Sequence, residues 1–123
     1  MQNDLLARTK QFALRVIRLY QALPKNSPAY VIGNQLLRSG TSVGANYRAA
    51  YRARSRADFV AKMAVTLEEA HESAYWLELL IESGTVKPQR LQGLLDEANQ
   101  LVAIFAASRL TAMAAKPRAR SSF

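Results

Sequence analysis

The sequence predicts a single all-α domain, an up-down-up-down antiparallel four-helix bundle. Apolar residues recur three and four residues apart along four segments, which is helical spacing. Proline, glycine and serine residues separate these segments. The connections are short, and short connections favour antiparallel neighbours. With 123 residues, the chain is long enough to bury one core.

Residues at the ends of the segments indicate where each helix starts and stops. Pro24 ends the first helix, because proline disfavours the α conformation of the residue before it. Ser55 and Asp58 resemble a capping box at the start of the third helix, and Gly84 is suited to its C-terminal cap. Pro88 suits the first position of the fourth helix. The expected helices span residues 4–23, 28–54, 56–83 and 88–115, in a domain of residues 1–115 followed by a basic tail, 116–123, that we expect to be mobile.

The second expected helix carries three glycines on one stripe: Gly33, Gly40 and Gly44. Glycine inside a helix costs about 1 kcal/mol relative to alanine. We therefore expect their missing side chains to allow close backbone approach. The alternative is that the helix breaks near Gly40, but the apolar period continues across that point, which favours a continuous helix.

A polar stripe on the same helix consists of Ser39, Ser42 and Asn46. It has two interpretations, a buried polar network that sets helix register and a surface that contacts a ligand. A buried Asn must be hydrogen bonded, and the available partners on the third helix are Glu69, Glu72 and Ser73. The structural interpretation is favoured, because setting register is the best-attested use of such groups.

Basic residues are concentrated in one part of the chain. The net charge is +8, and residues 24–56 contain six basic residues and no acidic residue. A focused basic excess is typical of a protein that binds a polyanion or an acidic protein surface, although a solvated helix face would look the same. Arginine can hold phosphate or carboxylate in two parallel hydrogen bonds. The predicted nucleic-acid-binding residues are Arg38, Arg48, Arg52, Arg54 and Arg56.

Catalytic and metal sites are not predicted. The chain has no cysteine and a single histidine, His71, whose Glu68-x-x-His71 spacing cannot be completed to a di-iron site by the other helices. No nucleophile has a local base, and no glycine-rich phosphate loop is present. We expect a non-enzymatic protein without cofactors. Neither a signal peptide nor a membrane span is apparent, and the absence of cysteine fits the cytoplasm.

Three aromatic residues are candidates for an oligomer interface: Tyr47, Tyr51 and Trp76. The two tyrosines lie one helical turn apart beside arginines, an arrangement that could also stack nucleic-acid bases. An interface is the favoured interpretation, because tyrosine is enriched there.

Three stretches, residues 35–47, 55–62 and 68–80, resemble a bacterial four-helix bundle family. That family includes the proteins encoded in intervening sequences of the large-subunit ribosomal RNA and the accessory variability determinant of diversity-generating retroelements. The most specific part is the run Arg38, Ser39, Ser42 and Asn46. One departure is Ala49, where many members carry an acid.

The resemblance implies a bundle that assembles into a ring, a pentamer in characterised members. It also implies that a basic surface binds nucleic acid, RNA or DNA, and that a reverse transcriptase can be a partner. Together with the charge pattern, this favours a homo-oligomeric nucleic-acid-binding accessory protein. The alternative is an interaction scaffold that docks an acidic protein without nucleic acid.

Overall fold

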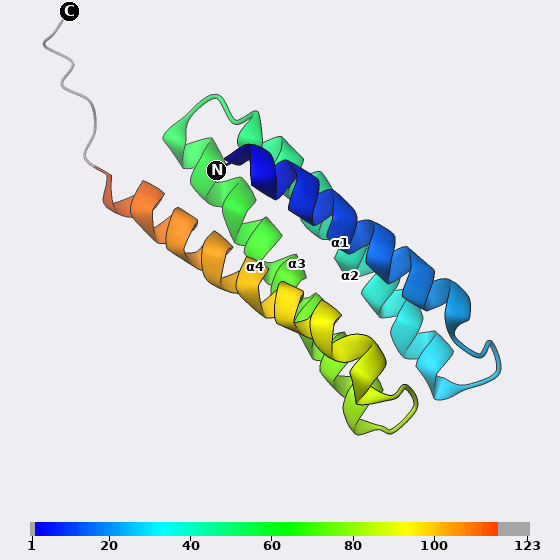
Figure 1. Cartoon of the computed structure of the whole chain (residues 1–123). Coiled ribbons are helices and arrows are strands. Elements are labelled where there is room, and N and C mark those ends of the chain that lie inside the picture. Colours follow the sequence, from blue (N-terminus) through cyan, green and yellow to red (C-terminus); the bar gives the residue numbers. More distant parts are fainter. Residues whose placement is uncertain (1, 116–123) are drawn as a thin grey trace, which may run out of the picture.

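The computed structural model describes residues 2–115, which form four α-helices joined by three short turns (Figure 1). The predicted all-α fold is confirmed. The predicted ring assembly stays a prediction, and the predicted mobile tail lies outside the described residues. The helices are α1, Gln2–Ala22; α2, Pro28–Tyr51; α3, Arg56–Glu82; and α4, Pro88–Ala114.

The ends of the helices follow the residues that mark them in the sequence. The Asp58 backbone N–H donates to the Ser55 hydroxyl at 3.0 Å, which is one of the two hydrogen bonds of the expected capping box. Gly84 has a φ of +74°, the left-handed conformation expected after a helix. Helix α2 runs unbroken through Gly40 but ends at Tyr51, three residues earlier than expected. The early end leaves residues 52–54 for the turn, because Ser55 is extended and already caps α3.

The glycine stripe of α2 packs directly against α1. A Cβ atom on Gly40 would lie 2.9 Å from Val16 Cγ2, and one on Gly44 would lie 3.4 Å from the Thr9 carbonyl oxygen. Val16 is completely buried. The expected close approach is therefore confirmed, and it is an approach between α1 and α2.

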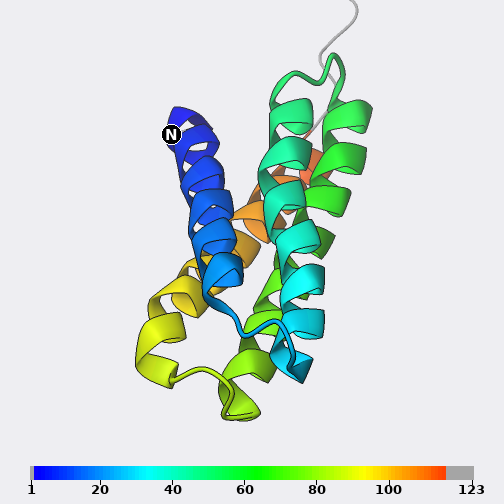
Figure 2. The ribbon, with the colours of Figure 1, turned by 90° about the vertical axis from the view of Figure 1, so that its right-hand side faces the viewer.

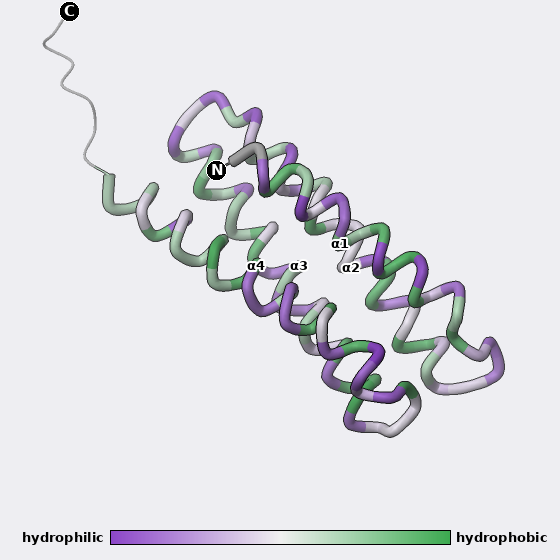
Figure 3. Tube along the Cα trace, viewed as in Figure 1, coloured by the Kyte–Doolittle hydropathy of each residue, from purple (hydrophilic) through white to green (hydrophobic). Residues whose placement is uncertain are grey.

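The helices are not packed equally around the core. Helix α1 packs mainly against α2, and α4 packs mainly against α3, whereas α1 and α4 come close at only a few points. Figure 1 shows the α1 ribbon apart from the α4 ribbon, and in Figure 2 the two ribbons cross at an angle rather than run side by side. Figure 3 shows apolar and polar residues alternating along each helix, as expected when one face is buried.

One ion pair bridges α1 and α4 away from the turns. The Arg8 guanidinium donates to both carboxylate oxygens of Glu97, at 3.0 and 2.8 Å, and to the Gln100 side-chain oxygen at 3.2 Å. Such two-point pairing fixes orientation as well as distance. It ties the first half of α1 to the first half of α4.

Candidate nucleic-acid interface

Four of the predicted arginines gather around the turn between α2 and α3. Arg48 lies in the last turn of α2, Arg52 and Arg54 lie in the turn, and Arg56 opens α3. All four are exposed, and none forms an ion pair with another residue of the described range 2–115. Arg56 donates a hydrogen bond to the carbonyl of Ala115. We call Arg48, Arg52, Arg54 and Arg56 the arginine cluster.

The fold explains why these residues lie close along the surface. The last turn of α2 and the first turn of α3 are joined by a connection of four residues, 52–55, so all four arginines lie at the same end of the bundle. Arg48 at the negative end of α2 is favoured by the helix dipole, but Arg56 at the positive end of α3 is not. The cluster therefore forms a local excess of positive charge that the backbone only partly balances.

Arg38 does not share this surface. Its guanidinium lies 2.9 Å from Glu72 Oε1 and 3.7 Å from Glu69 Oε1, both on α3. It precedes Arg48 by ten residues, which is about 15 Å along a helix. The structure thus places Arg38 in an ion-pair network between α2 and α3 and separates it from the arginine cluster.

Among residues 2–115, the predicted polar stripe forms one interhelical hydrogen bond, between Ser39 and Ser73. The hydroxyl oxygens of Ser39 and Ser73 lie 2.9 Å apart and are fully buried between α2 and α3. Ser42 donates to the carbonyl of Arg38 at 2.7 Å, and Asn46 donates to the carbonyl of Ser42 at 2.8 Å. The expectation that Asn46 bonds to α3 is therefore corrected, because its amide is satisfied within its own helix.

Two buried polar atoms of α3 have no hydrogen-bond partner among the described residues: Glu69 Oε1 and Trp76 Nε1. Burial raises the pKa of the Glu69 carboxyl above its ordinary value. The neighbouring Glu72 carboxylate raises this pKa further, while Arg38 lowers it. Glu69 thus lies within ion-pair distance of Arg38, but its Oε1 atom accepts no hydrogen bond from the described residues.

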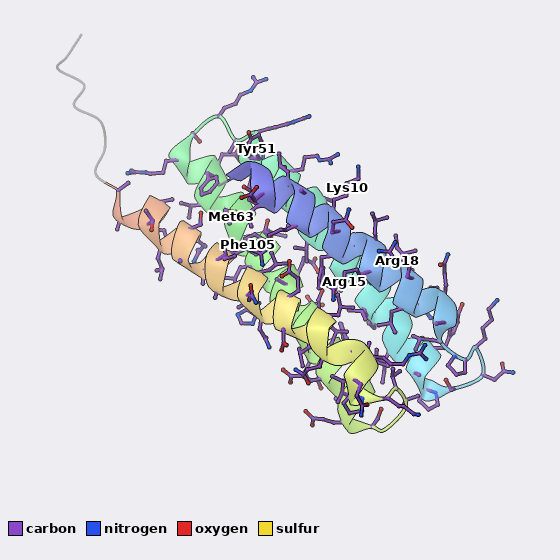
Figure 4. All side chains as sticks on the ribbon, in the orientation of Figure 1. Lys10, Arg15, Arg18, Tyr51, Met63 and Phe105 are labelled. Atoms are coloured by element: carbon purple, nitrogen blue, oxygen red, sulfur yellow. The ribbon has the colours of Figure 1, made fainter. Side chains whose placement is uncertain are left out.

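The three aromatic candidates occupy different environments. Tyr47 is 2% exposed and stacks on Phe105 of α4, with ring centroids 5.8 Å apart. Its place in an oligomer interface is corrected, because that ring is part of the bundle's own core. Tyr51 is 42% exposed at the end of α2 (Figure 4). Trp76 is half-buried and packs edge-on against Tyr75, an exposed aromatic residue that sequence analysis did not select.

Sequence analysis also missed a second group of basic residues, at the other end of the bundle. Arg15 and Arg18 of α1 lie across a cleft from Lys87 and Arg90 at the start of α4. These pairs are about 70 residues apart in the sequence, so only the fold brings them together. A local signal was present: Lys87 and Arg90 flank a helix start that has no acidic residue in its first turn.

Neither metal ligation nor membrane insertion finds support in the described part of the chain. Within residues 2–115, no three histidine, cysteine or acidic side chains come together in a way that could hold a metal ion. Among the same residues, no helix meets the length and hydropathy that a transmembrane span requires.

Comparison with known proteins finds a matching family and similar solved structures. A model of the 23S rRNA-intervening sequence protein family matches residues 1–107, which include the arginine cluster. A solved structure from Bacteroides thetaiotaomicron, described as a protein of unknown function from the S23 ribosomal protein family, is similar over 90% of this chain and 100% of its own. It is 35% identical in sequence, with a TM-score of 0.80. No curated protein sequence matches the chain.

Proposed function

Because this chain belongs to the 23S rRNA-intervening sequence protein family, we propose that it is a non-enzymatic RNA-binding protein that holds phosphate groups with the arginine cluster. The observation that carries the proposal is the cluster itself. Its four guanidinium groups are exposed around one turn and form no ion pair with any other described residue. The family's name points to RNA as the first polyanion to test.

Binding of this kind is mainly electrostatic. Contacts to phosphate fix the position of a protein on a nucleic acid but carry no sequence information. Each neutralised phosphate releases counterions, so affinity falls as salt rises. The proposed activity is therefore salt-sensitive and largely independent of RNA sequence.

The finer predictions rest on the family resemblance alone. A ring of copies would repeat the cluster on one particle and raise its avidity for RNA. A DNA ligand, a reverse transcriptase partner and the pentameric state stay predictions of the same kind.

The test measures the affinity of the full chain for a fluorescent RNA oligonucleotide at several salt concentrations. Arg52→Ala/Arg54→Ala removes two charges from the cluster, and Lys10→Ala/Lys25→Ala is the matched control. Lys10 and Lys25 are exposed and lie outside the cluster. The slope of log affinity against log salt should fall by about 1.4 to 1.8 in the cluster variant, because each phosphate contact contributes roughly 0.7 to 0.9.

Two results would contradict the proposal. One is the absence of RNA binding at low salt, and the other is an equal loss of slope in the two double variants. The competing hypothesis, in which the cluster docks an acidic protein, is separated by a pull-down after nuclease treatment. A partner that is lost on nuclease treatment supports RNA binding, and a partner that is retained supports protein docking.

A further inference from the structure

The cleft between α1 and α4 is a second basic site, distinct from the arginine cluster. It encloses about 800 Å³ at the end of the bundle where α1 turns into α2 and α3 turns into α4. The arginine cluster lies at the opposite end. Two cations come from each wall of the cleft: Arg15 and Arg18 from α1, and Lys87 and Arg90 from the start of α4.

No negative charge balances these four cations inside the cleft. None of the residues that line it is acidic, and none of the four cations pairs with an acid anywhere in residues 2–115. Arg8, two turns before Arg15 on the same helix, is by contrast fully paired with Glu97. The same two helices therefore pair Arg8 with a carboxylate and leave the four cations of the cleft without an acidic partner among residues 2–115.

The start of α4 adds to the positive potential. Lys87 is the N-cap residue and makes no capping hydrogen bond with its side chain, and the first turn contains no acidic residue. The N-terminal end of a helix carries a partial positive charge, which attracts anions and repels cations. Lys87 and Arg90 thus lie where a helix favours negative charge.

Arg15 reaches across the gap towards α4 (Figure 4). Its Nη2 atom lies 3.4 Å from the place that a Cβ on Gly93 would occupy. Glycine within a helix is unfavourable by about 1 kcal/mol relative to alanine. Gly93 therefore lowers the stability of α4 but leaves space for the Arg15 guanidinium. The guanidinium consequently lies against the far wall, where it can meet a ligand held between the helices.

The remaining lining of the cleft is aliphatic apart from Thr85. Leu91 and Leu94 form a buried floor, and Leu19 and Val86 are only partly buried above it. No aromatic side chain lines the cleft, so a nucleobase has no ring to stack on. The four separated cations suit a ligand that carries several carboxylates. The aliphatic floor suits a ligand that also carries aliphatic side chains. The chain's own last eight residues contain three basic and no acidic residues, so they do not fit.

We propose that this cleft binds an acidic amphipathic segment of a partner protein. Its carboxylates pair with Arg15, Arg18, Lys87 and Arg90, and its aliphatic side chains enter between α1 and α4. Apolar anchors supplied by one short segment and flanked by charge pairs are a recurrent mode of peptide recognition. With the arginine cluster free at the other end, one chain can hold RNA and an acidic protein together.

The test uses a fluorescein-labelled synthetic peptide in which leucines recur at helical spacing among glutamates, and anisotropy is measured with the full-length protein. The cleft variant is Arg18→Glu/Arg90→Glu, and Arg52→Glu/Arg54→Glu is its matched control at the other end. All four residues are exposed, so the fold tolerates the changes. We expect the cleft variant to weaken peptide binding at least about tenfold and the control to change it less than about twofold.

Other measurements decide between the possible occupants. Methyl chemical shifts of Leu19 and Val86 should change on peptide addition, and a polyglutamate peptide of equal charge should bind more weakly. The proposal is overturned by equal losses in the two variants, by equal binding of polyglutamate, or by competitive displacement of the peptide by single-stranded RNA. It is overturned as well if the cleft variant abolishes self-association, since the occupant would then be a second copy. If only the Arg52→Glu/Arg54→Glu control loses RNA binding, that result bears on the proposed RNA binding by the arginine cluster and not on the cleft.

Discussion

Replacing Gly40 by alanine should destabilise the protein, although alanine is the better helix former. The added Cβ would lie 2.9 and 3.1 Å from the two Cγ atoms of Val16 and 3.3 Å from its Cβ. Valine has one strongly preferred rotamer in a helix, so Val16 cannot turn away and α1 must shift. Overpacking of this kind costs about 1 to 3 kcal/mol, and the gain in helix propensity is about 1 kcal/mol. Contact with three atoms of a stiff side chain places the overpacking cost at about 2 to 3 kcal/mol. After the gain in helix propensity is subtracted, the free energy of unfolding should fall by about 1 to 2 kcal/mol.

Gly44→Ala is the matched control, because Gly44 lies one turn further along the same stripe. Its nearest contacts would be at 3.4 Å, from the Thr9 carbonyl and hydroxyl oxygens, which is close to ordinary van der Waals distance. This variant should keep most of the propensity gain and be as stable as the natural chain or slightly more stable. The two variants should thus differ by about 2 kcal/mol.

The assay is urea unfolding followed by circular dichroism at 222 nm. In addition, Val16→Ala should be less harmful in the Gly40→Ala background than alone, because the smaller side chain relieves the overlap. The reasoning is refuted if Gly40→Ala is as stable as Gly44→Ala, or if Val16→Ala costs the same in both backgrounds.

Two further predictions concern the polar seam between α2 and α3. Because the pKa of Glu69 is raised in the folded protein, the folded state binds more protons than the unfolded state just above pH 4.5, and stability falls as pH rises through that window. Glu69→Gln should therefore gain stability relative to the natural chain as pH rises to 7, while the exposed Glu68→Gln should not; a gap that is constant between pH 4 and pH 7 would refute this. Ser73→Ala should cost about 0.5 to 1.5 kcal/mol by removing the hydrogen bond to Ser39, because the Ser39 hydroxyl keeps its longer contact, 3.4 Å, to the Leu36 carbonyl. Adding Ser39→Ala should recover part of that loss in a double-mutant cycle measured by urea unfolding, and strict additivity of the two changes would count against the hydrogen bond.

Local signals in the sequence predicted the helices well because each signal acts within a few residues. Ser55 caps α3 through a bond to Asp58, three residues away, and Gly84 ends it with a positive φ. The end of α2 was predicted three residues too late, since helical spacing continues past Tyr51. The residues of the turn must come from the end of α2 or the start of α3. Because the extended Ser55 already caps α3, the turn shortens α2.

The candidate site was predicted less completely, because exposure depends on neighbours from distant segments. Arg38 and Arg48 look alike on a helical wheel, but carboxylates of α3 hold only Arg38. Tyr47 and Tyr51 are one turn apart, yet Phe105 of α4 covers Tyr47 and leaves Tyr51 exposed. Such differences come from side chains 30 to 60 residues away in the sequence, and no local pattern contains them.

The sequence by itself determined the four helices, the glycine stripe that allows close approach to α2, and the concentration of arginines around one turn. Each of these follows from backbone preference, side-chain size or charge along a short stretch. The tertiary structure alone decided which basic residues stay unpaired and that Arg15, Arg18, Lys87 and Arg90 face one another across a cleft. The physical reason is that α1 and α4 are the first and last helices, so their approach depends on how all four helices pack.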